Sequence, residues 1–237
     1  AFFDFDGDLV SDPYMMVTYF EAVRRHFFTT SGDSQTTERH WGIQSDRPVN
    51  ADYDGDGKTD IAVQRDFDGS WWIWPSSGAP LYNRYWGVPG DIPAPADYDG
   101  DGKTDIAVFR PTTGEWFALV GANGDQLLLR QFGLNGDHPM PGDYDGDGRA
   151  DFAVFRPYAG MYFVCPTAGS TCTGPGEAYA LPGAVWGTPI EADYDGDGRQ
   201  DPAVWMPDGR FIYRFSSTAT TGETPFGLVG GRPLGEG

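Results

Sequence analysis

The sequence predicts an all-β protein built as a β-propeller of four-stranded blades. The main observation is an acidic nine-residue string that occurs five times, beginning at Asp4, Asp52, Asp97, Asp143 and Asp193. Successive copies are therefore 48, 45, 46 and 50 residues apart, a period typical of propellers and solenoids. Short runs of β-branched and aromatic residues follow each string, and no stretch combines helical periodicity with helix caps. We expect five repeats that close into a five-bladed ring.

Each repeat has the same internal order. A proline-containing lead-in such as I-P-A-P-A-D precedes the acidic string, and an alternating strand such as I-A-V-F-R follows it. A glycine turn then leads to an aromatic strand, and a fourth segment ends in an aromatic-glycine pair. The five pairs are Trp41-Gly42, Trp86-Gly87, Phe132-Gly133, Trp186-Gly187 and Phe226-Gly227. These features predict one domain, residues 1–237, with repeats at 1–46, 47–91, 92–137, 138–187 and 188–237.

The end of the chain is consistent with ring closure. A further copy of the acidic string, 45 residues after Asp193, would begin at position 238, one past the last residue. The sequence therefore predicts five whole units, with the tail Phe226–Gly237 leading back toward Ala1. The alternative is that the five repeats are a piece of a longer ring or array.

The acidic string reads D-Y-D-G-D-G-[KR]-x-D in four copies and D-F-D-G-D-L-V-S-D in the first. Four carboxylates within nine residues repel one another unless a cation lies between them. Ca²⁺ takes six to eight oxygen ligands, which side chains at positions 1, 3, 5 and 9 and a carbonyl at position 7 can supply. Glycines such as Gly55 and Gly57 allow positive φ, so the loop can wrap closely around an ion.

The string therefore predicts up to five Ca²⁺ sites, one in each loop. The expected side-chain ligands are Asp4, Asp6, Asp8 and Asp12; Asp52, Asp54, Asp56 and Asp60; Asp97, Asp99, Asp101 and Asp105; Asp143, Asp145, Asp147 and Asp151; and Asp193, Asp195, Asp197 and Asp201. The expected carbonyl ligands are those of Val10, Lys58, Lys103, Arg149 and Arg199.

Other metals and another loop type fit less well. Mg²⁺ requires stricter octahedral geometry, and Zn²⁺ favours Cys and His, which the loops lack. An EF-hand needs a glutamate at position 12, where this chain has valine or methionine.

The charge of the chain comes mainly from these loops. The net charge is −19, and without the twenty loop aspartates it would be −19 + 20 = +1. A chain with this charge balance lacks the basic stripe that binds nucleic acid, and no apolar run is long enough to span a membrane.

Cys165 and Cys172 are spaced for a small disulfide loop in an oxidising compartment, or they are free thiols in a reducing one. Since Ca²⁺ is abundant outside cells, we expect a secreted or cell-surface protein.

The D-x-D-G-D-G-x-x-D loop, the A-V-F-R-P strand and the terminal W-G or F-G together resemble FG-GAP/VCBS-type repeats. The resemblance covers essentially the whole chain, is strongest in repeats two to four and is weakest in repeat one. Such repeats occur in secreted bacterial proteins, integrin α-subunit heads and some fungal lectins, and commonly form seven blades. The resemblance implies a propeller with Ca²⁺ between the first and second strands of a blade, bound by the four Asp side chains and the position-7 carbonyl.

Other conspicuous residues have structural alternatives. Trp71 and Trp116 share a repeat position with Tyr162 and Phe211, which favours a buried core position over a sugar-stacking surface. Trp72 and Trp74 lie off that position and are better candidates for exposure. The recurring Arg65, Arg110 and Arg156 could bind anionic sugars, but pairing with a carbonyl or acid of a neighbouring blade is favoured.

The function that follows is non-catalytic. The chain has three histidines and no recognisable nucleophile, metalloprotease or phosphate-loop motif. The favoured hypothesis is a structural or adhesion module that associates with itself or with another extracellular protein. The alternative is a Ca²⁺-dependent lectin that binds a glycan, and an accessory domain of a secreted enzyme is a third possibility.

Overall fold

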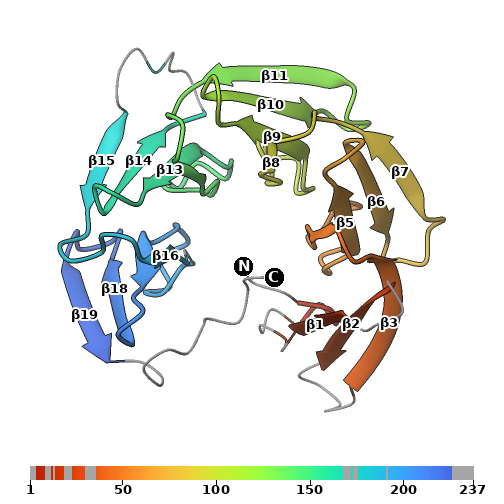
Figure 1. Cartoon of the computed structure of the whole chain (residues 1–237), viewed down its shortest axis with the longest axis horizontal. Coiled ribbons are helices and arrows are strands. Elements are labelled where there is room, and N and C mark those ends of the chain that lie inside the picture. The colour runs from red at the N-terminus through yellow and green to blue at the C-terminus, as the bar shows by residue number, and fades with distance from the viewer. Residues whose placement is uncertain are drawn as a thin grey trace.

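The structure is a computed structural model that describes residues 4–8, 12, 14–18, 23–29, 36–167, 172, 176–190 and 192–225. All its regular elements are β-strands, grouped into five antiparallel sheets around a common axis (Figure 1). The protein is therefore an all-β propeller, as the sequence predicts. Within the described residues no helix has the length and apolar character needed to cross a lipid bilayer.

Four of the sheets are four-stranded blades, which we number 2 to 5 after their repeats. Each begins with a two-residue strand beside the axis, followed by three longer strands that lie progressively further out (Figure 1). Blade 2 contains β4 (Arg47–Pro48), β5 (Ile61–Arg65), β6 (Ser70–Trp74) and β7 (Tyr82–Tyr85); blade 3 contains β8 (Ile92–Pro93), β9 (Ile106–Arg110), β10 (Glu115–Val120) and β11 (Gln126–Gln131). Blade 4 contains β12 (His138–Pro139), β13 (Phe152–Arg156), β14 (Met161–Cys165) and β15 (Glu177–Ala180); blade 5 contains β16 (Thr188–Pro189), β17 (Ala203–Trp205), β18 (Arg210–Arg214) and β19 (Thr221–Pro225).

The first repeat forms a different sheet. Its described strands are three, β1 (Tyr14–Thr18), β2 (Val23–Thr29) and β3 (Thr36–Ile43). The prediction of five four-stranded blades is therefore not supported, because four such blades are seen. In blades 2 to 5 the innermost strand is a proline-containing lead-in before the acidic loop, and residues 1–3, which precede Asp4, lie outside the described residues. The predicted return of the tail Phe226–Gly237 to Ala1 also lies outside them.

The hydrophobic core lies between neighbouring blades. Trp71 and Ile73 of blade 2 pack with Val108 of blade 3, and Trp116 of blade 3 packs with Phe152 of blade 4. Blades 4 and 5 share a third cluster. The predicted core position is confirmed for Trp71, Trp116 and Tyr162, which are fully buried, while Phe211 is half-buried. A blade is covered on both faces, so its strands are apolar at successive positions.

One predicted repeat position is wrong. Trp86 and Phe132 each lie 11 residues before the next acidic loop, but Trp186 lies only seven residues before Asp193. Leu181 takes the equivalent place: its N–H donates to Gly160 O at 3.0 Å, as the N–H of Trp86 donates to Gly69 O at 2.8 Å. Trp186 instead lies on the surface, 69% exposed, with a left-handed φ of 62°. Trp186-Gly187 has the residue types of the aromatic-glycine pair, but it lies closer to the next acidic loop than the other pairs do.

Candidate metal-binding loops

In blades 2 to 5 the acidic loop joins the innermost strand of the blade to the second, close to the axis of the propeller. In the second loop, the carboxylate of Asp52 accepts hydrogen bonds from Gly55 N at 2.7 Å and Gly57 N at 2.8 Å. Both glycines have φ near 80°, a conformation that L side chains rarely adopt. The third, fourth and fifth loops repeat these two bonds, through Asp97, Asp143 and Asp193. The first aspartate therefore folds the loop back on itself.

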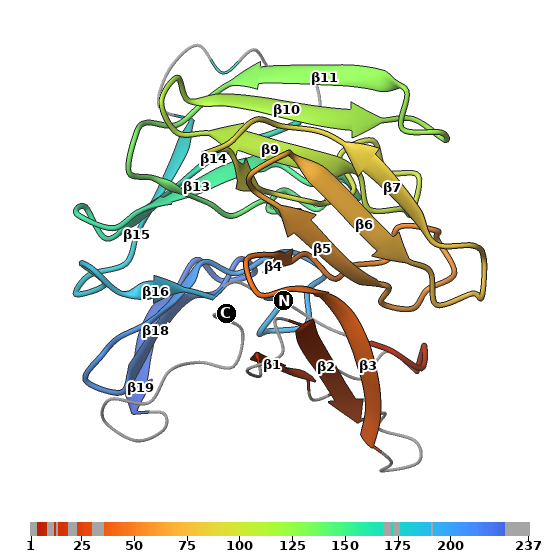
Figure 2. The ribbon, with the colours of Figure 1, turned by 45° about the vertical axis from the view of Figure 1, so that its right-hand side comes forward.

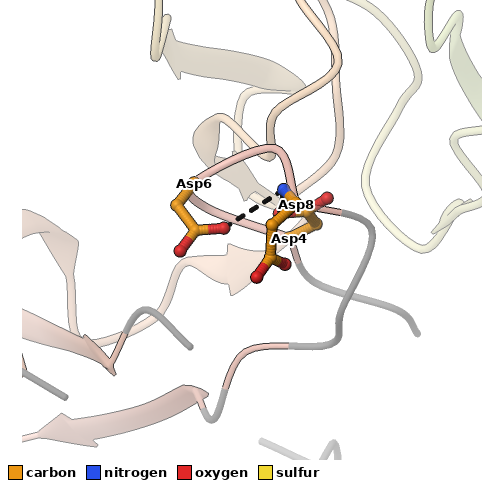
Figure 3. Close-up of side chains that lie close together, drawn as sticks. All are labelled: Asp4, Asp6 and Asp8. Atoms are coloured by element: carbon orange, nitrogen blue, oxygen red, sulfur yellow. Dashed lines mark hydrogen bonds between the residues drawn. The ribbon is translucent and has the colours of Figure 1, made fainter. Parts of the chain in front are cut away.

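The folded loops gather carboxylates. In every loop three carboxylate oxygens from three aspartates lie within 4.8 Å of one another. Figure 3 shows the first group, in which Asp8 N donates to Asp6 Oδ1 at 3.2 Å. The groups are Asp4, Asp6 and Asp8; Asp52, Asp54 and Asp60; Asp97, Asp99 and Asp101; Asp143, Asp145 and Asp151; and Asp193, Asp195 and Asp197.

Five of the predicted carboxylate ligands do not join these groups: Asp12, Asp56, Asp105, Asp147 and Asp201. The aspartate at position 5 bonds to the loop backbone in the second and fourth loops: Asp56 Oδ1 accepts from Lys58 N at 2.9 Å, and Asp147 Oδ1 from Arg149 N at 2.9 Å. Val10, the carbonyl ligand predicted for the first loop, lies outside the described residues.

The aspartate at position 9 is buried in the body of the blade. Asp60 accepts from Tyr53 N at 2.9 Å and from Ser76 N at 2.6 Å, and Asp105 accepts from Tyr98 N at 2.9 Å. Burial raises the pKa of Asp60 to about 6 and the pKa values of Asp105 and Asp151 to about 7. These carboxyls therefore carry an unfavourable charge at neutral pH unless a cation compensates it.

Neighbouring loops contact one another around the axis. The carbonyl of the first aspartate accepts a hydrogen bond from the next loop: Thr104 N donates to Asp52 O at 2.7 Å and Ala150 N to Asp97 O at 2.6 Å. The aliphatic stem of Lys103 lies on the preceding loop, since a Cβ added at Gly55 would be 3.0 Å from Lys103 Cγ. The loops therefore form one connected layer at one end of the propeller.

Hydroxyl groups that the sequence analysis missed also reach the loops. Ser76 Oγ lies 2.9 Å from Asp56 Oδ1 and Ser77 Oγ donates to Asp54. In blade 5, Ser216 and Ser217 contact Asp197 and Asp195 in the same way. In the sequence these hydroxyls are marked by a Ser-Ser pair at the start of the turn between the last two strands of a blade. The pair is present in only two repeats, so it does not stand out as part of the repeat pattern.

The donor set fits a hard divalent cation. All the gathered atoms are carboxylate oxygens, and neither Cys nor His contributes to a group among the described residues. Oxygen-only sites with several carboxylates suit Ca²⁺ and Mg²⁺, whereas Zn²⁺ favours nitrogen and sulfur. When bound, such a cation would supply positive charge at the centre of each group.

The recurring arginines are engaged in ion pairs with acids. Arg110 donates to both carboxylate oxygens of the buried Asp91, at 2.8 and 2.9 Å. Arg65 pairs in the same way with Asp46, and Arg156 with Asp137. Each acid lies in the connection that enters the same blade. Pairing with an acid, the favoured interpretation, is therefore confirmed, although the acid does not come from a different blade.

The remaining conspicuous residues are surface features. Trp74 is exposed and Trp72 half-buried, as their position off the repeat predicts. Cys165 and Cys172 form a disulfide, so the oxidised alternative holds. His40 pairs with Glu38 at 2.9 Å, and no Ser, Thr or Cys bonds to its ring or to that of His138 in the described part of the chain.

Comparisons with known proteins agree with this architecture. The FG-GAP-like repeat family matches residues 52–108 and 97–154, and the FG-GAP repeat family matches residues 135–180. Together the matches cover residues 52–180, more than half of the chain. A search of curated proteins found no match.

Solved structures share the fold at low identity. Virginiamycin B lyase from Staphylococcus aureus is 9% identical with a TM-score of 0.53, and the match covers 91% of this chain and 70% of the lyase. A putative 6-phosphogluconolactonase from Bacteroides fragilis is 13% identical with a TM-score of 0.56, covering 93% and 69%. At such identities the likeness concerns the fold alone. The repeat matches and the blade architecture together place the chain in the FG-GAP repeat family.

Proposed function

We propose that this chain is a non-catalytic, Ca²⁺-stabilised structural and interaction module of an extracellular or cell-surface assembly. One observation carries the metal part: every acidic loop gathers three carboxylate oxygens within 4.8 Å. Bound Ca²⁺ would offset the repulsion in each loop, and binding to the folded state alone would stabilise the fold. The disulfide between Cys165 and Cys172 supports an oxidising compartment.

The metal proposal is tested at Asp99, in the third loop. Asp99→Ala should lower the melting temperature markedly in Ca²⁺ but little in chelator. In Ca²⁺ the ion loses a ligand, whereas in chelator the loss of the hydrogen bonds from Gly121 N at 2.6 Å and Asp101 N at 3.1 Å is offset by weaker repulsion among the loop carboxylates. Circular dichroism melts in Ca²⁺, in Mg²⁺ and in chelator provide the measurement. Asp125→Ala removes an exposed acid of the same blade and serves as the matched control. Equal losses for Asp99→Ala with and without Ca²⁺ would contradict an occupied site.

The interaction part rests on the face opposite the acidic loops. The second strand of each blade runs away from its loop, so the following turn and the connection to the next blade lie at the other end (Figure 2). This end carries several exposed apolar side chains: Phe67, Val88, Leu134, Tyr158, Val185 and Trp186. Exposed apolar side chains that recur on one face favour a protein contact, and we propose a second copy of the chain as the occupant.

Self-association predicts a mass that increases with protein concentration. Leu134→Ser should weaken it, because Leu134 is 53% exposed on this face. Leu127→Ser is the control, since Leu127 is 58% exposed on the outer strand of the same blade. Sedimentation velocity in Ca²⁺ provides the measurement. A strictly monomeric protein at high concentration, or equal effects of the two substitutions, would contradict the assignment.

We also propose that the first sheet packs against blade 5, which closes the ring. Tyr98 and Tyr144 follow the first aspartate of their loops and are buried against the next blade, whereas the equivalent Tyr194 is 41% exposed. Packing of the first sheet on this flank would bury Tyr194. A crystal structure with Tyr194 facing solvent, in a monomer of the whole chain, would contradict closure.

The second candidate function is carbohydrate binding. It is favoured by the exposed Trp74, whose ring centroid lies 5.4 Å from that of Trp41. Paired aromatic rings at a surface are a common platform for ligands. A glycan array probed in Ca²⁺ and again in chelator separates this function from assembly: sugar-specific retention supports it, and a blank array leaves assembly as the function.

A further inference from the structure

A cleft between blades 2 and 3 brings together aromatic, cationic and amide side chains. It lies at the end of the propeller that carries the acidic loops and has a volume of about 290 Å³. That volume is just below the range for drug-sized ligands, roughly 300–1,000 Å³, and would suit a single small ring. Its lining comes from separate elements: Tyr82 and Arg84 from β7, Lys103 from the third acidic loop, and Asn123 from the turn between β10 and β11.

The cleft has an apolar floor. Tyr53 and Ile106 are almost fully buried at its base, and Tyr82 and Leu119 are half-buried beside them. Aromatic and aliphatic surface of this kind accepts the C–H face of a sugar ring, while polar groups at the rim fix its orientation.

Two cations at the rim have unfilled donor capacity. In contrast to Arg65, Arg110 and Arg156, neither Arg84 nor Lys103 has a carboxylate oxygen within 4.0 Å among the residues that the structure describes. Among the described residues the Arg84 guanidinium donates a single hydrogen bond, a long one of 3.4 Å to Asn83 O. A guanidinium and an ammonium beside one cleft are a natural receptor for a carboxylate.

Both cations are held in place by packing. The Arg84 guanidinium carbon lies 5.5 Å from the centroid of the Tyr82 ring, within the range of a cation–π interaction. The stem of Lys103 lies on Gly55, where a side chain would displace it. Packing of this kind reduces the entropy that a ligand must overcome when it orders the two side chains.

The acids of the cleft are already engaged. Asp101 Oδ1 accepts from Lys103 N at 3.0 Å, and Asp105 Oδ2 accepts from the buried Tyr98 N at 2.9 Å. Both belong to the third loop, where a bound cation would partly neutralise their negative charge. An anionic ligand therefore meets unpaired cations and partly compensated acids.

We propose that this cleft binds an acidic sugar, with the carboxylate between Arg84 and Lys103, the ring against the apolar floor at Ile106 and Leu119, and a hydroxyl on Asn123. The inference rests on the carbohydrate-binding candidate function and gives it a site and a ligand class. No covalent step is involved.

The test compares two sugars that differ only at one carbon. Methyl β-D-glucuronide carries a carboxylate where methyl β-D-glucoside carries a hydroxymethyl group. Isothermal titration calorimetry in saturating Ca²⁺ should detect the glucuronide and give at least tenfold weaker binding of the glucoside, since a charge-assisted pair is worth about one order of magnitude or more. Equal affinities for the two sugars would overturn the acidic ligand class.

Two substitutions test the location of the site. Arg84→Gln and Lys103→Gln should each weaken glucuronide binding by about tenfold. Arg149→Gln is the matched control, because Arg149 contacts Gly100 as Lys103 contacts Gly55, one blade junction further on. Binding of the glucuronide that neither substitution affects, or no heat at millimolar glucuronide, would overturn the proposal.

A parallel Ca²⁺ titration separates this proposal from the metal proposal. The predicted metal ligand of Lys103 is its backbone carbonyl, which a substitution of the side chain keeps. Lys103→Gln should therefore keep the Ca²⁺ affinity of the protein while weakening its glucuronide affinity. Protein that binds Ca²⁺ but no glucuronide contradicts only the cleft. Glucuronide binding without Ca²⁺ binding contradicts only the metal sites, and glycan retention on an array that is insensitive to Arg84→Gln places the sugar site elsewhere.

Discussion

At the residue scale, one ion pair shows how the charge of a buried aspartate is compensated within a blade. Asp91 is buried, and its carboxylate is neutralised by the bidentate Arg110, whose guanidinium also lies 4.4 Å from the Phe117 ring centroid. In blade 5 both members are replaced together, by Gly187 and Met206, which keep the spacing of 19 residues. A buried carboxylate without its arginine would lower the stability of the fold by several kcal/mol. Replacing both members of the pair is therefore less destabilising than replacing the arginine alone.

This pair predicts a strongly non-additive double-mutant cycle. Arg110→Met should destabilise the protein by about 3–5 kcal/mol, because it leaves Asp91 uncompensated. The double variant Asp91→Gly with Arg110→Met copies blade 5 and should be at least about 1 kcal/mol more stable than Arg110→Met alone. Urea denaturation in Ca²⁺ measures both. Destabilisations that simply add would contradict the pairing.

At the element scale, the connection between β15 and β16 contains a strained residue. Trp186 has φ of 62° where the equivalent turns of blades 2 and 3 end in Gly90 and Gly136, with φ near 90°. A left-handed conformation costs a bulky residue about 1–3 kcal/mol unless the surroundings compensate it. Since Trp186 is largely exposed, its side chain recovers little of this cost by burial.

Trp186→Gly should therefore raise the free energy of unfolding by about 1 kcal/mol. Gly136→Ala is the reciprocal control and should lower it by a similar amount, because a Cβ at Gly136 would meet no atom within 4 Å and only the backbone would resist. Thermal melts of both variants in Ca²⁺ provide the comparison. A destabilised Trp186→Gly would mean that the indole makes a stabilising contact.

At the scale of the whole molecule, the buried aspartates couple stability to pH. Burial raises the pKa of Asp60 to about 6 and the pKa values of Asp105 and Asp151 to about 7, whereas carboxyls of an unfolded chain titrate near 4. Between about pH 4 and pH 7 the folded protein holds protons that the unfolded chain has released. Stability without metal should therefore decrease as pH rises through this window.

Ca²⁺ should reverse this slope. Metal binding requires ionised carboxylates, so the ion stabilises the folded state more strongly as pH rises. We expect the melting temperature in chelator to fall between about pH 4 and about pH 7, and the melting temperature in saturating Ca²⁺ to rise over the same range. Thermal melts in a buffer series measure both slopes. Parallel slopes with and without Ca²⁺ would show that these aspartates do not respond to the ion.

The fold and the candidate loops could be predicted because their determinants are local. The nine-residue acidic string contains its own glycines and capping carboxylates, so its shape follows from bonds such as Gly55 N to Asp52. The four-strand unit follows from alternation and turn residues within about 45 residues. The disulfide between Cys165 and Cys172 and the buried positions of Trp71 and Trp116 could also be predicted, because they follow from short spacing and from the repeat position.

The sequence by itself thus determined an all-β repeat propeller with carboxylate-lined loops. Only the tertiary structure decided which residues of different repeats meet. Leu181 instead of Trp186 fills the register position, the serines of an outer turn reach the loops, and the cleft joins Arg84 of one blade to Lys103 of the next. Such contacts depend on how blades pack, and packing is set by shape and burial between segments far apart in the chain, which local patterns do not encode.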